Sequence, residues 1–139
     1  MTDKGFGGDL TPQNTEFLRA AGLRVDEVSG AVVRGWIELG PDHHTPWGMV
    51  HGGVYASAVE SAASLGASAA VEEGGQIAVG VNNSTDFLRP MGEGRVEVVA
   101  EPIMQGKSQQ LWQVIITRAE DGKEVARGQV RLQNVPLPS

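Results

Sequence analysis

The sequence predicts an α+β domain in which one long helix packs against a curved antiparallel sheet of five to six strands. The helix is predicted because residues 53–73 contain no proline and hold seven alanines and four serines. The sheet is predicted because alternating apolar and polar residues dominate the chain after that helix. Many of the 19 glycines fall between these periodic segments, where they mark turns.

Two shorter elements are expected before the long helix. Residues 12–21 predict a small helix, with Thr11 as its N-cap and Pro12 at its first position. Residues 31–39 predict a strand, because two kinds of side chain alternate along them. One face of this strand carries Val33, Gly35, Ile37 and Leu39, and the other carries Arg34, Trp36 and Glu38.

Four further strands are expected after the helix, at residues 76–88, 95–104, 109–119 and 123–135. Asp121-Gly122 is a strong hairpin signal between the last two. Because consecutive hairpins join neighbouring strands, the sheet is expected to be antiparallel. The last strand alternates, which places Val125, Arg127, Gln129 and Arg131 on one face and Ala126, Gly128, Val130 and Leu132 on the other.

Length, charge and composition restrict the class of protein. The 139 residues suit a single domain, expected at 11–135, with flexible ends at 1–10 and 136–139. The net charge is −6 and the 11 basic residues are spread along the chain, so no nucleic-acid partner is expected. No targeting or membrane-spanning pattern is found, and the lack of cysteine fits a reducing compartment. We therefore expect a cytoplasmic protein without a membrane partner.

Metal and serine-nucleophile chemistry are not expected. The histidines His43, His44 and His51, together with Asp42, lack a regular ligand spacing such as H-E-x-x-H. The serines of the long helix lie in its interior, and the chain contains no G-x-S-x-G motif.

Glu60 stands out because it is the only charged residue of the long helix between Gly52 and Val71. Mid-helix glutamates are usually solvated, but an exposed helix face normally carries further charges, and here the neighbours one turn away are small. A carboxylate buried without a partner is costly, so this one is expected to have a purpose. Ser57 and Ser64, one turn before and one turn after it, are expected to hydrogen-bond it.

His51-Gly52-Gly53 lies where the long helix begins. The first N–H groups of a helix have no partner within the helix, and glycines there allow a substrate carbonyl to come close. The pair of glycines forms either a plain turn or an oxyanion hole for acyl transfer. Gly52 and Glu60 are eight residues apart in the sequence, which corresponds to about 12 Å along a helix. If both act on one acyl carbon, they must come from two chains related by a twofold axis, and a homodimer follows.

A family resemblance rests on "GMVHGGVYASAVESAAS" and on the segment from "VGVNNSTDFLRP" to "ARGQVRL". Over about residues 30–133 the chain resembles the hotdog-fold acyl-CoA thioesterases. It is most similar to the branch with 4-hydroxybenzoyl-CoA, 1,4-dihydroxy-2-naphthoyl-CoA and phenylacetate-pathway thioesterases. The resemblance implies a long helix wrapped by an antiparallel sheet, an acyl-CoA substrate and no cofactor. It also implies dimers that join their sheets edge to edge and commonly pair into a homotetramer.

The resemblance also implies roles for individual residues. Glu60 matches the carboxylate that attacks the thioester carbonyl or activates water, and Gly52 matches the backbone donor to the thioester oxygen. His51 matches a histidine that orients this region or the leaving thiolate, and Ser64 a hydroxyl that positions water. Thr45 is a departure, because relatives place a glutamine fifteen residues before the acid.

Substrate-binding residues are expected in several segments. The resemblance places coenzyme A near Asp86 to Arg89 and its phosphates near Gly106, Lys107 and Ser108, although Lys107 and Arg89 also suit an ordinary solvated surface. Gly53 is expected beside the thioester. The aromatic and apolar residues that either line an acyl pocket or belong to the core are Trp36, Trp47, Met49 and Phe87.

Hydrolysis of an aromatic or medium-chain acyl-CoA is the function expected from these observations. The alternative is a protein of the same fold that binds acyl-CoA or an acylated carrier without hydrolysing it. Hydration of an enoyl thioester is disfavoured, because hydratases on this scaffold resemble a different motif with paired Asp and His, which is not found here.

Overall fold

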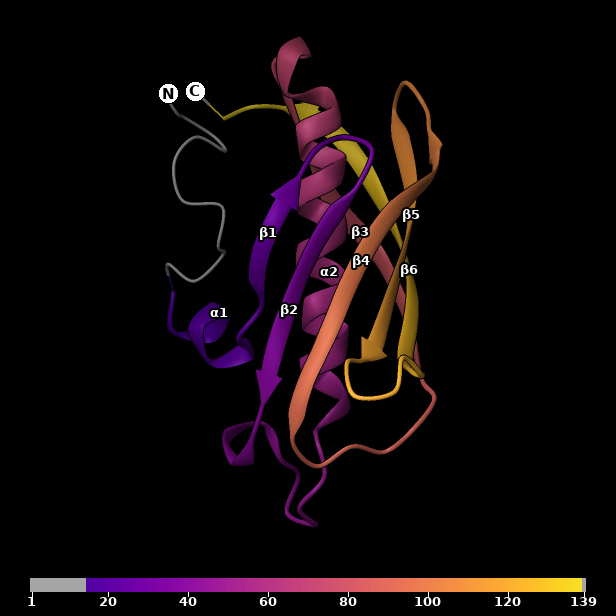
Figure 1. Ribbon diagram of the computed structural model, residues 1–139. Helices are drawn as coiled ribbons and strands as arrows, with labels where there is room; N and C mark the ends of the chain where they lie inside the picture. The colour runs from indigo at the N-terminus through magenta and orange to yellow at the C-terminus, as the bar shows by residue number, and fades with distance from the viewer. Residues whose placement is uncertain (1–14, 139) are drawn as a thin grey trace.

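The computed structural model describes residues 15–138, and it confirms the α+β class. A six-stranded antiparallel sheet with strand order β1-β2-β4-β5-β6-β3 curves around one long helix, α2 (Figure 1). The elements in chain order are α1 (Glu16–Ala21), β1 (Arg24–Val28), β2 (Val33–Leu39), η1 (Pro41–His43), α2 (Gly52–Val71), η2 (Glu72–Gly74), β3 (Gln76–Phe87), β4 (Gly94–Gln105), β5 (Gln109–Arg118) and β6 (Glu124–Pro136).

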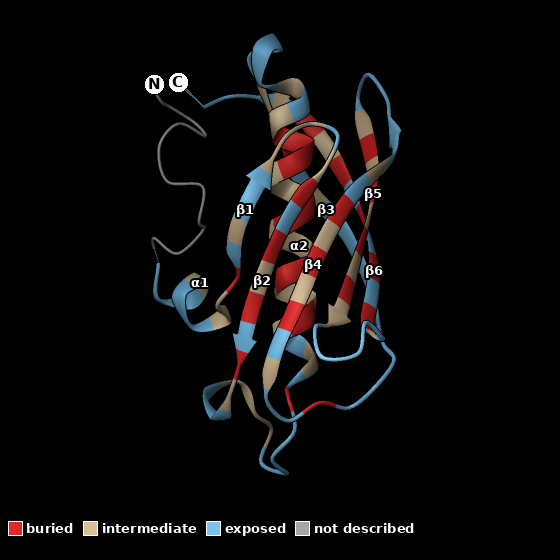
Figure 2. Cartoon of the chain, viewed as in Figure 1, coloured by how far each residue is buried: buried red, intermediate tan, exposed pale blue. Residues whose placement is uncertain are grey.

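Helix α2 lies against the inner face of the sheet, and small residues allow a close approach. Its buried side includes Ala58, Ala62, Ala63 and Ala67, and Figure 2 shows buried residues along the helix and the strands that face it. Gly66 is a point of close contact, since a Cβ added there would lie 2.5 Å from the buried Trp112 ring of β5. Because the side chains on this face of the helix are small, the sheet can curve closely around it.

Gly66→Ala is expected to lower the free energy of unfolding by about 1–2 kcal/mol. Overpacking a filled core costs about 1–3 kcal/mol, and the better helix propensity of alanine recovers up to about 1 kcal/mol. Urea unfolding measures this change. Gly74→Ala is the matched control, since an added Cβ there meets nothing within 4 Å and a change within about 0.5 kcal/mol is expected. Equal stability of the two variants would contradict the tight contact with Trp112.

Strand β1 was not predicted, because a bulge hides its periodicity. The pairing of β1 with β2 shifts register between Val25 and Glu27, so Asp26 is an extra residue. A bulge adds one residue to a strand and thereby breaks the period of two on which strand prediction depends.

A second bulge, in β6, places one residue on the face opposite to the predicted one. Residues 126, 128, 130 and 132 face the core as expected, but Val125 is fully buried as well, although it was expected on the opposite face. The register between β5 and β6 shifts between Ile116 and Thr117, which places both Val125 and Ala126 inside. The hairpin at Asp121-Gly122 is confirmed, with Gly122 at a φ of 75° and its N–H bonded to the Arg118 carbonyl at 2.7 Å.

The two ends of the chain differ from the expected boundaries. Helix α1 begins at Glu16, and the Thr15 hydroxyl caps it by accepting from the Leu18 N–H at 3.2 Å. The predicted N-terminal boundary was therefore too early; Thr11, Pro12 and the expected flexible segment 1–10 lie outside the described residues. At the other end β6 runs to Pro136, and the Leu137 N–H donates to the Gly75 carbonyl at 2.9 Å.

Strand β3 forms one long edge of the sheet. Its twelve residues pair only with β6 on one side. Val79 and Val81 are 45% and 55% exposed, and the register shifts between Gly80 and Asn82, which makes Val81 an extra residue. An unpaired strand edge of this length with exposed valines is a template for pairing with another chain.

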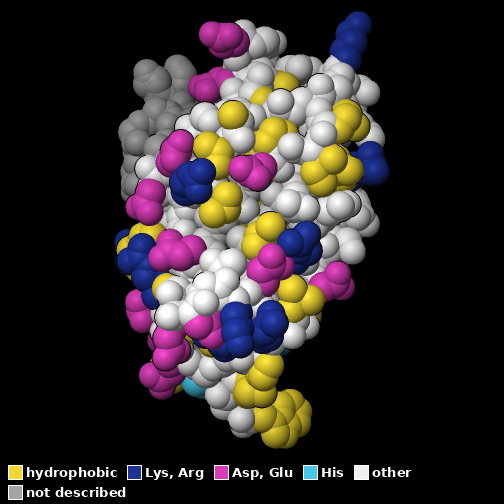
Figure 3. Space-filling model, turned by 45° about the vertical axis from the view of Figure 1, so that its right-hand side comes forward, with side chains coloured by type: hydrophobic (Ala, Val, Ile, Leu, Met, Phe, Trp, Pro, Cys, Tyr) yellow, Lys and Arg dark blue, Asp and Glu magenta, His cyan; other side chains and the backbone are white. Residues whose placement is uncertain are grey.

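The outer surface of the sheet carries charges of both signs. Figure 3 shows basic and acidic side chains intermingled on one face, and the ion pairs of the strands include Arg127–Glu124 at 3.0 Å and Arg95–Glu97 at 2.8 Å. Among residues 15–138, every helix is too short or too polar to cross a membrane.

Candidate active site

The start of α2 leaves one backbone donor free. His51 is the N-cap, and its Nδ1 accepts a hydrogen bond from the Gly53 N–H at 2.8 Å. The Val54 N–H donates to the His51 carbonyl at 3.0 Å. Within the described residues, the Gly52 N–H has no hydrogen-bond partner. The structure therefore distinguishes the two glycines, because only the Gly52 amide is available to a ligand.

The contact at His51 also assigns its proton. Since Nδ1 accepts from a backbone N–H, the ring carries its hydrogen on Nε2. An added Cβ at Gly53 would lie 2.9 Å from the His51 ring, so a glycine is required beside the cap. Gly53 thus serves the cap of the helix, and its N–H does not point freely to a substrate as the sequence had suggested.

The segment before α2 is held by its two other histidines. His44 Nε2 lies 2.6 Å from the Gly92 carbonyl, which connects this segment to the loop between β3 and β4. His43 Nε2 lies 2.9 Å from the Ala20 carbonyl at the end of α1. Thr45 lies in the turn between them and α2, where its hydroxyl accepts from the Trp47 N–H at 3.2 Å. No cluster of metal-ligating side chains occurs in the described part of the chain.

Glu60 is half-buried and lies against strand β3. Its Oε1 accepts a hydrogen bond from Asn83 Nδ2 at 3.2 Å, and the same amide also donates to the Ala56 carbonyl at 3.1 Å. Thr85 orients the amide by donating to Asn83 Oδ1 at 2.6 Å. Ser57 and Ser64 make no hydrogen bond with Glu60 in the described structure, so the predicted serine support is wrong. They are on the same helix, and the carboxylate extends sideways toward the strand instead.

Gly80 makes room for this carboxylate. A Cβ added at Gly80 would overlap Glu60 Oε2, so only glycine permits this position of the acid. Gly80 lies at the bulge of β3, and bulges often occur next to active sites because they redirect the chain. Asn83 and Gly80 were not predicted as site residues. Asn83 lies in the polar run 82–86 of a strand that otherwise starts apolar, and Gly80 lies just before that run.

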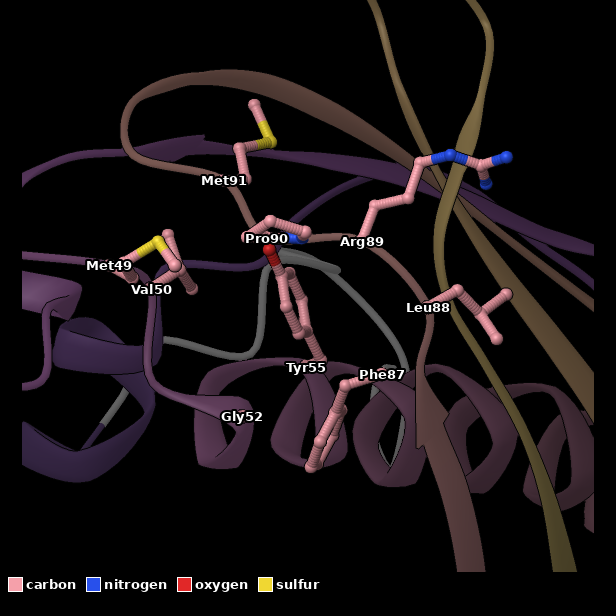
Figure 4. A pocket seen from close by; sticks show the side chains of 9 residues that line it. All are labelled: Met49, Val50, Gly52, Tyr55, Phe87, Leu88, Arg89, Pro90 and Met91. Atoms are coloured by element: carbon pink, nitrogen blue, oxygen red, sulfur yellow. The ribbon is translucent and has the colours of Figure 1, made fainter.

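A cavity of about 190 Å³ lies beside Gly52 (Figure 4). It is lined by residues 49, 50 and 52, by Tyr55 and by residues 87–91. Phe87 covers Gly52, since a Cβ there would lie 2.5 Å from the Phe87 ring. Met49 and Phe87 therefore line a cavity, and the use of that cavity as an acyl pocket stays a prediction.

The two tryptophans named for the acyl pocket lie elsewhere. Trp47 is 85% exposed in the turn before α2. Trp36 lies on the outer side of β2, with the Arg95 guanidinium 4.3 Å from its ring centroid. Neither side chain lines the cavity beside Gly52.

The residues expected to bind coenzyme A are far apart within one chain. Arg89 lines the cavity and donates to the Glu124 carbonyl at 2.7 Å, whereas Asp86 lies beside Arg127 on the outer face of the sheet. Residues 106–108 form the turn between β4 and β5, at the end of the sheet where α2 finishes (Figure 1). Asn134 holds this turn by donating to the carbonyls of Gly106 and Lys107.

Comparison with known proteins shows to which family the chain belongs. A family model described as the thioesterase superfamily matches residues 48–125. The chain belongs to the thioesterase superfamily. As a member it is an enzyme, a thioester hydrolase with the hotdog fold, and its relatives by sequence and by structure agree with that placement.

Two curated relatives of this thioesterase cover most of its length. A Mycobacterium tuberculosis protein named provisionally as an esterase is 46% identical over 117 residues, covering 82% of each chain. An Arabidopsis thaliana protein named 1,4-dihydroxy-2-naphthoyl-CoA thioesterase 2 is 35% identical over 118 residues, covering 80% of this chain and 73% of its own.

Solved structures have the same fold as this thioesterase. The structure of the M. tuberculosis protein superposes with a TM-score of 0.84 at 42% identity and covers 90% of this chain and all of its own. A thioesterase from Haemophilus influenzae superposes with a TM-score of 0.84 at 26% identity, covering 94% of this chain and 90% of its own.

Proposed function

We propose that this thioesterase hydrolyses aromatic or medium-chain acyl-CoA at a site shared between two protomers. Glu60 is the nucleophile or the general base, and the Gly52 N–H is the oxyanion donor. The observation that carries the proposal is that one helix holds both an unpaired backbone amide and a positioned carboxylate. The amide lies at the helix start, and the carboxylate is held by Asn83 beside Gly80. An unpaired amide at a helix start suits a developing oxyanion, which supports a catalytic use.

The shared site follows from distances along α2. Gly52 and Glu60 are about 12 Å apart along the axis, so one carbonyl group cannot contact both within a protomer. Ala56 is the midpoint between them, and its carbonyl is bonded by Asn83 of the edge strand β3. If β3 pairs antiparallel with its copy about a twofold axis near Asn83, Glu60 lies level with the partner's Gly52. The exposed Val79 and Val81 would be covered by the same pairing.

The chemistry assigns a role to each group. The thioester oxygen accepts from the Gly52 N–H, which stabilises the negative charge that develops when the carbonyl carbon is attacked. Glu60 either attacks that carbon, giving an anhydride that water then hydrolyses, or takes a proton from the attacking water. In both cases the C–S bond breaks, coenzyme A leaves as a thiolate that takes up a proton, and the acid is released. Ser64, one turn after Glu60, positions water in this proposal, and His51 holds the helix start that carries the Gly52 amide by accepting from the Gly53 N–H.

Gly52→Pro tests the amide directly. Proline suits the first position of a helix, where it removes the N–H and adds its ring carbons, and His51 already has the extended conformation, at a ψ of 133°, that a following proline requires. We expect kcat for thiol release from benzoyl-CoA and hexanoyl-CoA to fall by about 10²–10³-fold, the usual effect of removing an oxyanion donor.

Gly52→Ala is the matched control for this variant. It adds the same Cβ beside Phe87 but keeps the N–H, so the ratio between the two variants reports the replacement of the amide hydrogen by the proline ring. Phe87 is 57% exposed and is expected to move aside in both variants. Equal kcat for the two variants would refute the oxyanion role of Gly52. Absence of thiol release from every aromatic and aliphatic acyl-CoA by the unmodified protein would favour the binding alternative.

A further inference from the structure

Two side chains of strand β3 form a hydrogen-bonded chain that ends on Glu60. Thr85 Oγ1 donates to Asn83 Oδ1 at 2.6 Å, and Asn83 Nδ2 donates to Glu60 Oε1 at 3.2 Å. Alternate residues of a strand share a face, so Asn83 and Thr85 both lie on the side of β3 that faces α2. Their partners in β6 agree, since Asn83 pairs with Val130 and Thr85 with Gly128, and both of these are buried.

The Asn83 amide is fixed in one orientation. Its nitrogen carries two hydrogens, and both are used, one on Glu60 Oε1 and the other on the Ala56 carbonyl at 3.1 Å. Turning the amide over would place its oxygen against these two acceptors. Ala56 lies one helical turn before Glu60, so Asn83 fixes the carboxylate relative to the backbone of the turn that carries it.

Glycines make room at both ends of this hydrogen-bonded chain. At one end, Gly80 admits the Glu60 carboxylate. At the other end, a Cβ added at Gly128 would lie 2.7 Å from Thr85 Oγ1 and 2.9 Å from Val59 of α2. Glycine weakens the interior of a strand and often marks a place where another group approaches closely. The two glycines therefore fit a local requirement for space around the acid and around the hydroxyl.

The chain of bonds restrains a side chain that otherwise has several rotamers. Glu60 is half-buried, and within the described residues Asn83 is the only hydrogen-bond partner of its carboxylate. A glutamate without such a partner rotates about three side-chain torsions. Misplacement of a reacting group by about 1 Å costs about 10²-fold in rate, so the orientation of this acid matters for turnover.

We propose that Asn83 and Thr85 are positioning residues of the hydrolytic reaction. Asn83 holds the Glu60 carboxylate in the orientation in which it reacts, and Thr85 holds Asn83. This rests on the proposed function, because the orientation of Glu60 affects the rate only if Glu60 takes part in the reaction. Both residues lie on the edge strand through which two protomers would meet. The strand that brings in the partner's Gly52 would then also direct the acid toward it.

Thr85→Val removes one end of the chain of bonds. Valine keeps the branched shape of threonine and lacks the hydroxyl, so Asn83 loses one hydrogen bond. We expect kcat for thiol release from benzoyl-CoA and hexanoyl-CoA to fall by about 5–10-fold, the effect of one hydrogen bond, while KM stays within about twofold. Thr85→Ser keeps the hydroxyl and is expected to retain kcat within about twofold. Ser84→Ala, which removes a hydroxyl from the outer face of the same strand, is the matched control.

Asn83→Leu removes the bond to the acid itself. Leucine has nearly the same shape as asparagine and cannot donate, and we expect kcat to fall by about 10–100-fold with KM within about twofold. Asn82→Leu is the matched control, because it makes the same change one residue earlier, where the side chain makes no hydrogen bond in the described structure. Its kcat is expected to stay within about twofold. Circular dichroism and Tm on the same samples measure the fold of both variants.

The double variant Thr85→Val/Glu60→Gln separates a positioning role from a structural one. If Thr85 acts through Glu60, Thr85→Val removes nothing further once the acid is gone, and kcat of the double variant equals that of Glu60→Gln within about twofold. A loss of the same factor in both backgrounds would show that Thr85 supports the fold or substrate binding instead, and would overturn the inference. Lower Tm with unchanged kcat in Thr85→Val and Asn83→Leu would overturn it as well.

Failure of the inference is distinguishable from failure of the proposed function. If Glu60→Gln abolished thiol release while Thr85→Val and Asn83→Leu kept full kcat, the positioning role would be wrong and the role of Glu60 would stand. Full activity of Glu60→Gln, or absence of thiol release by the unmodified protein, would refute both. Should Asn83→Leu fail to fold, the comparison of Thr85→Val with Thr85→Ser decides, because these two variants differ in the hydroxyl that reaches Asn83.

Discussion

Glu60→Gln is expected to lower kcat for thiol release by about 10³-fold or more while the protein keeps its fold and oligomeric state. The amide has the same shape as the carboxylate, so it fits beside Gly80 and still meets Asn83. It can neither attack a carbonyl carbon nor accept a proton from water at neutral pH, so both candidate mechanisms fail. Single-turnover and steady-state thiol release measure the loss of kcat. Circular dichroism and size-exclusion chromatography on the same samples measure the fold and the oligomeric state.

Glu73→Gln is the matched control for that variant. It makes the same chemical change in the exposed η2 turn that follows α2, where no catalytic role is proposed, and kcat is expected to stay within about twofold. If Glu60→Gln kept a tenth or more of the activity, Glu60 would be neither the nucleophile nor the general base. A site built only for binding would show that pattern, since the fixed carboxylate would then contribute little to turnover.

Local signals predicted the elements that depend on neighbouring residues in the sequence. The long helix, the strand predicted at 31–39 and found at 33–39, and the hairpin at Asp121-Gly122 are confirmed because propensity, alternation and turn chemistry act over a few residues. Strand β1 and the inward position of Val125 were not predicted, because each depends on a bulge. A bulge is set by the register against another strand, which a single chain segment does not reveal.

In the candidate site, too, local features were predicted and features that depend on distant segments were not. The acid and the glycines stood out because their chemistry was unusual for a helix of alanine and serine. Their partners could not be predicted, since Asn83 and Gly80 reach Glu60 only when β3 folds against α2, 20 or more residues further along the chain. The difference between Gly52 and Gly53 likewise depends on the side-chain rotamer of His51.

Mixing Glu60→Gln with Gly52→Pro is expected to restore activity that neither variant has alone. In a dimer with one chain of each kind, one site receives glutamine and proline, and the other receives the intact Glu60 and the intact Gly52. Random pairing of equal amounts makes half of the dimers mixed, so activity of about a quarter of the unmodified protein is expected. The chains are co-expressed with different affinity tags, or mixed in denaturant and refolded, and thiol release is measured before and after.

The double variant Glu60→Gln/Gly52→Pro provides the reciprocal test against the unmodified chain. If each site takes its acid from one protomer and its amide from the other, both sites of that mixed dimer are defective, and activity falls below the share of unmodified chains present. If one protomer supplied both groups, every unmodified chain would keep its full activity and the first mixture would stay inactive. We expect both sites of that mixed dimer to be defective, because Gly52 and Glu60 are about 12 Å apart along the helix and no side-chain movement of a glutamate spans that length. The edge strand β3, with Asn83 bonded at the midpoint of the two groups, is the surface through which the two chains would meet.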